Sequence, residues 1–200
     1  MSDISRAKAI LESAAGTIKS FRAPALRIND DTIKVLKETG FSTDSSTCPQ
    51  RFDGPLTFGS TKKLKWLIAS RKPFFLDSDE SILEIPISAF IFPYIGTTMR
   101  ISPGLTRLLG RSLYFEARQT GKPLVFLFHP NECLDPTDLI ITTCRTKNPL
   151  KHLFADHIRQ RLKLRRLGVA AIEVLDEIIL NAKQQGFDFC TAIEYRKRRS

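Results

Sequence analysis

The chain has 200 residues, of which 42% are hydrophobic and 26% are charged, with a net charge of +10. This is the composition of an ordinary globular domain, and it excludes low-complexity and fibrous chains. No apolar run approaches the roughly 20 residues of a membrane span, and the first residues lack the apolar segment of a secretory signal.

The cysteines are widely scattered, without a C-x-x-C pair and without the spacing of a zinc finger. We therefore expect reduced thiols in a cytoplasmic protein with no membrane partner. The four cysteines are Cys48, Cys133, Cys144 and Cys190.

Helical and strand-like patterns alternate in the first part of the chain. Apolar residues at helical spacing predict two helices, which Gly16 and Gly40 end, and Asn29 opens the second. A short apolar run after each helix predicts a strand. This order predicts an α/β fold with parallel strands covered by helices. The expected elements are helices over residues 4–14 and 29–40 and strands over residues 17–21 and 41–45.

Residues 46–81 are punctuated by prolines and glycines, and we interpret them as an irregular insertion. Within it, Leu64, Leu67 and Ile68 are compatible with one short helix. Regular patterns return after the insertion, where Pro86 must fall at a strand end or a bulge. The later elements are strands over residues 83–88, 124–128 and 187–191, helices over 102–119, 150–164 and 169–182, and a basic tail over 196–200.

Much of the excess positive charge lies in residues 159–166 and 196–199. Such clusters can bind nucleic acid. A solvated helix face followed by a frayed basic tail is the commoner explanation. No aromatic stacking motif, helix-turn-helix pattern or zinc-finger spacing accompanies the charge, so nucleic acid is the less favoured partner.

Arg22 and His129 each follow a strand-like apolar run and stand close to a proline. The ends of parallel strands gather at one rim of an α/β fold, which would bring the two side chains together. Histidine titrates near neutral pH without special help. The pair therefore predicts a hydrolytic site.

Each candidate also has a structural interpretation. Arg22 can be an exposed arginine at a strand end, and Asp44 can cap a loop. His129 can be a turn residue, because the proline after it only requires extended backbone. For the nearby Glu132 we expect a carboxylate that faces solvent.

The order of several short motifs resembles the polysaccharide deacetylase family. The resemblance runs from about residue 4 to residue 195 and covers the later part of that family's domain. It implies an incomplete, irregular β/α barrel. The motifs are Phe21-Arg22-Ala23-Pro24, Gly40-Phe41-Ser42-Thr43-Asp44-Ser45-Ser46, Leu83-Glu84-Ile85-Pro86, Phe128-His129-Pro130-Asn131-Glu132 and Gly186-Phe187-Asp188-Phe189.

The resemblance implies a metal-dependent hydrolase of N-acyl amides, which are non-peptide C–N bonds in carbohydrates or small compounds. In that family zinc or a similar divalent ion polarises the carbonyl group and activates water. By the same resemblance Arg22 would orient the catalytic base, and His129 would protonate the leaving amine. Asp44 would orient the imidazole of His129.

The family's early metal-binding motifs have no counterpart here. The residues before Arg22 contain neither a strand with paired aspartates nor a histidine. His152 and His157 are five positions apart, about 140° around a helix, which is poor geometry for chelation. We therefore predict no metal ligand in this chain, although the complete family domain would bind zinc. Residues 1–200 would be a single domain, the C-terminal portion of a deacetylase-like barrel.

Two consequences follow from such an incomplete barrel. Activity would be impaired without the missing N-terminal segment, so the alternative is a catalytically inactive fragment that binds or scaffolds. Unpaired strand edges would also be exposed, and these favour self-association or a partner chain.

Overall fold

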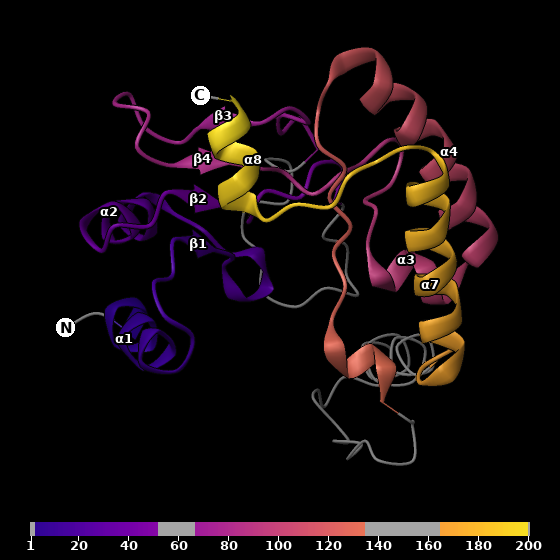
Figure 1. Ribbon diagram of the computed structural model, residues 1–200, viewed down its shortest axis with the longest axis horizontal. Coiled ribbons are helices and arrows are strands. Elements are labelled where there is room, and N and C mark those ends of the chain that lie inside the picture. The colour runs from indigo at the N-terminus through magenta and orange to yellow at the C-terminus, as the bar shows by residue number, and fades with distance from the viewer. Residues whose placement is uncertain (1–2, 52–66, 135–164, 200) are drawn as a thin grey trace, which may run out of the picture.

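The computed structural model describes residues 3–51, 67–134 and 165–199. They form a mixed α/β structure in which a small sheet lies beside two helices at one end and a helical pair lies at the other (Figure 1). The helices are α1 (Asp3–Ala15), α2 (Asp30–Glu38), α3 (Gly96–Ile101), α4 (Pro103–Thr120), α7 (Val169–Gln184) and α8 (Ala192–Arg199), with 3-10 turns η1 (Pro24–Leu26) and η2 (Pro130–Cys133).

The sheet has four short strands in the order β1-β2-β4-β3. Strands β1, β2 and β4 are parallel to one another, and β3 pairs with β4 in the antiparallel direction. Parallel strands covered by helices were expected, and the pairings of β1 with β2 and of β2 with β4 are parallel. The described residues form no closed barrel, so the barrel remains a prediction. The strands are β1 (Ser20–Phe21), β2 (Thr43–Asp44), β3 (Phe74–Phe75) and β4 (Leu83–Glu84).

Backbone hydrogen bonds extend this parallel set beyond the strands. The N–H of Ile87 donates to the carbonyl of Thr47 at 2.9 Å, and the N–H of Ser88 donates to the carbonyl of Val125 at 2.9 Å. The predicted strand over 124–128 therefore lies next to the end of β4. It is not a regular strand, because the N–H of Val125 bonds to the side-chain Oγ of Ser88 instead of a backbone carbonyl.

The predicted helix boundaries are confirmed by capping contacts. The side chain of Asn29 accepts from the N–H of Thr32 at 2.8 Å at the start of α2. Ser102 caps α4 in the same way, with Pro103 in the first turn. Gly40 after α2 has a positive φ of +74°, a conformation that glycine adopts without strain.

Several expectations differ from the structure. Helix α3 and strand β3 were not predicted, and residues 187–191 are irregular instead of forming a strand. The basic residues 196–199 belong to helix α8 and not to a frayed tail. The predicted helix over 150–164 lies outside the described residues, as do His152, His157, Leu64 and most of the 159–166 cluster.

Apolar packing ties the sheet to the helices. One cluster joins α3, α4 and α7, and a second lies under the turn after β1 and beside Leu127. A third holds α2 against the sheet. No helix among the described residues combines the length and apolar character that crossing a bilayer requires.

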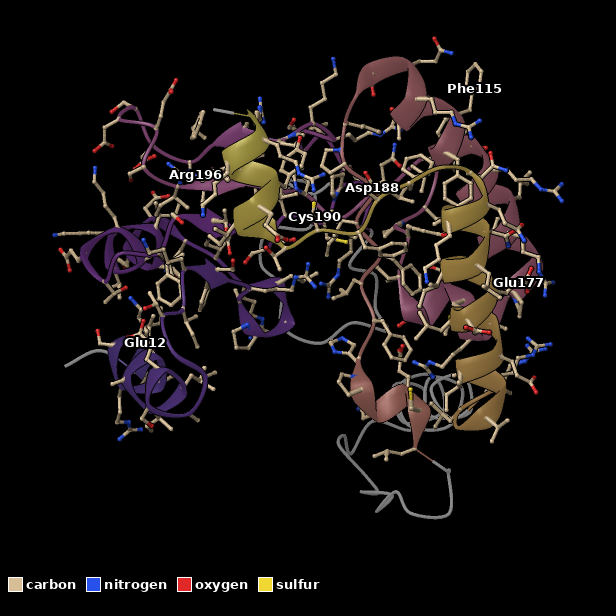
Figure 2. The ribbon with its side chains drawn as sticks, viewed as in Figure 1. Glu12, Phe115, Glu177, Asp188, Cys190 and Arg196 are labelled. Atoms are coloured by element: carbon tan, nitrogen blue, oxygen red, sulfur yellow. The ribbon has the colours of Figure 1, made fainter. Side chains whose placement is uncertain are left out.

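Helix α8 is fastened to the sheet through Arg196. Its guanidinium donates to the backbone carbonyls of Ser42 and, at 2.6 Å, of Ser81, and also to that of Glu80 at 3.1 Å. Helix α8 lies against β2 in Figure 1, with Arg196 labelled in Figure 2. One cationic side chain thus ties α8 to residues just before two neighbouring strands.

Replacing Arg196 with alanine is expected to lower the free energy of unfolding by about 1–3 kcal/mol, because charged hydrogen bonds to three carbonyls are lost. Urea unfolding followed by circular dichroism measures this. Arg199→Ala is the matched control on the exposed side of α8. Equal destabilisation by both changes would contradict the anchoring role.

Candidate functional site

Arg22 leaves the carboxyl end of β1 and bonds to the residue that follows β2. Its Nε donates to the carbonyl of Ser45 at 2.9 Å, and its Nη2 donates to Ser45 Oγ at 2.7 Å. Ser45 Oγ in turn donates to the carbonyl of Ile85 at 2.7 Å. Burial of the head group lowers the pKa of Arg22, while the charges of Asp44 and Glu84 oppose this. Arg22 is therefore held by three successive parallel segments.

Asp44 and Glu84 form a buried carboxyl pair beneath Arg22. They stand opposite each other on neighbouring parallel strands, and their residues are 1% and 0% exposed. Burial, and then the hydrogen bond to Asp44 and its charge, raise the pKa of Glu84 to about 9. Glu84 is thus protonated near neutral pH.

The outer oxygens of the pair have separate partners. Asp44 Oδ1 accepts from Ser46 Oγ at 2.7 Å, and Glu84 Oε1 accepts from the N–H of Thr47 at 2.8 Å. Ser46 Oγ also accepts from the N–H of Ala23 at 2.8 Å. Residues 46–49, the start of the segment interpreted as an irregular insertion, are therefore buried, and Ser46 and Thr47 join three strands.

The structure brings Arg22 and Asp44 together but does not join them to His129. His129 is exposed and precedes η2, and no hydrogen bond links its imidazole to another described residue. Asp44 accepts its hydrogen bond from Ser46, so no contact supports its predicted role of orienting His129. The segment that leads to His129 joins the sheet where the N–H of Ser88 donates to the carbonyl of Val125. This bond lies several residues beyond the level of Arg22, which explains why His129 is separated from Arg22.

Glu132 was expected to face solvent, and that expectation is wrong. It is 3% exposed, and its Oε1 accepts from Arg100 Nε at 3.1 Å. The carboxyl group of Glu132 lies against Gly96, whose lack of a side chain leaves the space that this group occupies. The N–H of Glu132 donates to the carbonyl of His129 at 2.9 Å, so this ion pair fixes the turn that carries the histidine.

A cavity of about 670 Å³ opens beside Arg22. It lies between the sheet edge, residues 122–128, helix α7 and the segment 186–192 that leads into α8. Figure 2 labels Asp188 and Cys190 on that segment, which passes across the middle of the molecule. His129 is not among the lining residues.

The described residues do not fit the zinc ion that the family resemblance implies. No group of three or more histidine, cysteine or acidic side chains is placed to hold a metal in residues 3–51, 67–134 and 165–199. The buried pair holds a proton on Glu84, whereas carboxylate ligands must be deprotonated. We therefore derive no chemical step through a metal.

Comparison with family models, with curated proteins and with solved structures finds no match for this chain.

Sequence reasoning missed Glu84 as part of the site. Its neighbours Leu83, Ile85 and Ile87 are apolar, so an acidic residue inside a buried strand was the available signal. The sequence indicated Ser45 and Ser46 only as members of a motif, without a role for either side chain. Their roles depend on the register of β1 and β2, which sequence alone does not give.

Proposed function

We propose that this chain carries the later part of a deacetylase-type site for hydrolysis of N-acyl amides, in carbohydrates or small compounds. The supporting observation is that Arg22 and Asp44, which match two successive motifs, lie at the same end of neighbouring parallel strands in one bonded cluster. The type of reaction is inferred from the family resemblance, and the placement of the side chains is inferred from the bonded cluster.

In this proposal Arg22 positions a carboxylate base, because a guanidinium held by Ser45 presents its remaining N–H groups in a fixed direction. Delivery of a proton to the leaving amine by His129 rests on the resemblance alone, since His129 is exposed and does not line the cavity beside Arg22. Asp44 acts on Arg22 through its charge instead of on His129. The base and any metal would come from outside the described residues.

The test is an amine-release assay on N-acetylated chito-oligosaccharides and small N-acyl amides with added zinc or cobalt. It compares the chain alone with the chain joined to any segment encoded directly upstream. We expect activity mainly in the joined form, with Arg22→Ala and His129→Ala each lowering kcat/KM by about a hundredfold or more. Arg6→Ala, on the exposed face of α1, is the matched control.

The proposal fails if the joined form releases no amine from any of these compounds. It also fails if Arg22→Ala and His129→Ala are as active as the control variant. Circular dichroism on each variant separates a loss of chemistry from a loss of fold.

A second candidate is an inactive domain that binds a ligand or a partner chain. The favouring observation is that the described residues offer no metal-binding group, and that the carboxyl group of Glu84 is protonated near neutral pH. Elemental analysis of the purified chain would then give no stoichiometric divalent metal. We also propose a cytoplasmic location, since Cys133 and Cys190 are free thiols.

A further inference from the structure

A second hollow, a groove of about 410 Å³, lies between helices α4 and α7. The two helices contact each other and lie side by side in Figure 1. Neither Arg22, Asp44 nor His129 lines this groove, so it is separate from the site described above. Its volume is in the range of small-ligand sites. Helix α4 contributes three arginines to its wall, which are Arg107, Arg111 and Arg118.

The groove carries an excess of positive charge. The acidic side chain among its described lining residues is Glu177, which accepts two hydrogen bonds from Arg107, at 2.7 and 2.8 Å. Arg118 donates Nη2 to the backbone carbonyl of Gln185 at 2.6 Å, which fixes this side chain without cancelling its charge. Arg111 makes no hydrogen bond or ion pair with another described residue. The charges of Arg111 and Arg118 therefore remain for an anion.

An exposed aromatic ring stands between these two arginines on α4. Phe115 is four positions after Arg111 and three before Arg118, and such spacings make side chains neighbours on one face of a helix. Phe115 is 68% exposed and lines the groove. Figure 2 labels it on α4, with Glu177 on α7. One exposed phenylalanine is common on a protein surface, but here its ring lies beside two groups that can bind anions.

A flat ring flanked by phosphates is the repeating chemistry of a single nucleic acid strand. Arginine binds phosphate oxygens through its planar set of donors, and bases stack on aromatic rings whatever their sequence. From Arg107 to Arg118 helix α4 advances about 16 Å, which is long enough for more than one phosphate group. The basic clusters over residues 159–166 and 196–199 contain no aromatic residue, whereas this groove combines charge with a ring.

We propose that the groove between α4 and α7 binds single-stranded nucleic acid, with a base stacked on Phe115 and the adjoining phosphates on Arg111 and Arg118. The pair of Arg107 and Glu177 leaves the part of the groove nearer the start of α4 without net charge. Binding at this groove does not depend on the hydrolase proposal, because it uses other residues.

The experiment is fluorescence anisotropy of the full chain with three labelled strands of twelve units: oligothymidylate, oligouridylate and an abasic deoxyribose phosphate strand. The abasic strand keeps the phosphates and lacks the bases. We expect the two strands with bases to bind at least about tenfold more tightly than the abasic strand. Their affinity should fall steeply between about 50 and about 200 mM salt. The tighter of the two identifies DNA or RNA as the natural strand.

Two variants separate stacking from charge. Phe115→Ala should weaken oligothymidylate binding by about tenfold and leave the abasic strand unaffected, because a stacking contact alone is lost. Arg111→Gln should weaken binding of all three strands and lower the salt slope by about one. The matched controls, which should bind nearly as the wild type does, are Phe189→Ala, at a phenylalanine 61% exposed outside the groove, and Arg6→Gln on α1.

Thermal unfolding of each variant shows whether it is folded. The inference is overturned if neither strand with bases binds at about 50 mM salt. It is equally overturned if the abasic strand binds as tightly as the other two. Binding by Phe115→Ala and Arg111→Gln that matches their controls would place any charge-driven affinity elsewhere on this basic chain, and would end the proposal.

Discussion

Replacing Glu84 with glutamine is expected to remove most of the pH dependence of unfolding between mildly acidic and alkaline pH. The pKa of Glu84 is raised from 4.5 to about 9, first by burial and then by the hydrogen bond to Asp44 and its charge. Between these two values the folded chain holds a proton that the unfolded chain has lost. The stability due to that proton is complete below about pH 4.5 and is lost by about pH 9.

The wild-type free energy of unfolding should therefore fall as pH rises through this window, by at most about 1.4 kcal/mol per pH unit. Glutamine reproduces the protonated form. Its carbonyl can still accept from the N–H of Thr47, and its amide can donate to the Asp44 carboxylate. At about pH 8 the Glu84→Gln variant should thus be more stable than the wild type by a few kcal/mol.

Urea unfolding at a series of pH values from about 5 to about 9 measures the effect. Glu173→Gln, at an exposed position on α7, is the matched control and should follow the wild-type profile. A Glu84→Gln profile that runs parallel to the wild type would show that the pKa of Glu84 is not raised in the folded chain.

Replacing Gly96 with alanine is expected to destabilise the fold by about 2–4 kcal/mol. A Cβ atom there would lie 1.8 Å from Glu132 Oε2 and 2.7 Å from its Cδ. The carboxyl group has little room to move, because Arg100 holds Oε1 through Nε and Nη2, each at 3.1 Å. Relief of the clash would break a buried ion pair.

Gly104→Ala is the matched control, since a Cβ there meets nothing within 4 Å and alanine favours the helix. That variant should be neutral or stabilised by up to about 1 kcal/mol. The Gly96→Ala penalty should shrink in a Glu132→Ala background, which removes the opposing carboxyl group. An unchanged penalty in the double-mutant cycle would refute the clash as its cause.

Local signals predicted the helices well and the strands only in outline. The caps at Asn29 and Ser102 and the stops at Gly16 and Gly40 act on neighbouring backbone groups, so sequence alone locates them. The strands proved shorter than the apolar runs. Their length depends on which partner segment supplies hydrogen bonds, as the irregular segment at Val125 illustrates.

The candidate site was predictable only in its individual residues. Arg22 was found because it follows a strand-like run, and Asp44 was found through the family resemblance. Parallel pairing brings the two residues to one end of the sheet. The raised pKa of Glu84 could not be foreseen, because it requires the register that sets Asp44 opposite Glu84 and the burial of both. The inward turn of Glu132 likewise depends on Arg100, 32 positions away.

The contact between Arg196 and the carbonyl of Ser42 spans 154 positions of sequence. During synthesis the early strands are therefore complete long before α8 can dock beside them. Closing so large a loop has an entropic cost and slows folding. We expect nascent chains stalled before residue 192 to remain protease-sensitive, because α8 cannot yet dock on the early strands.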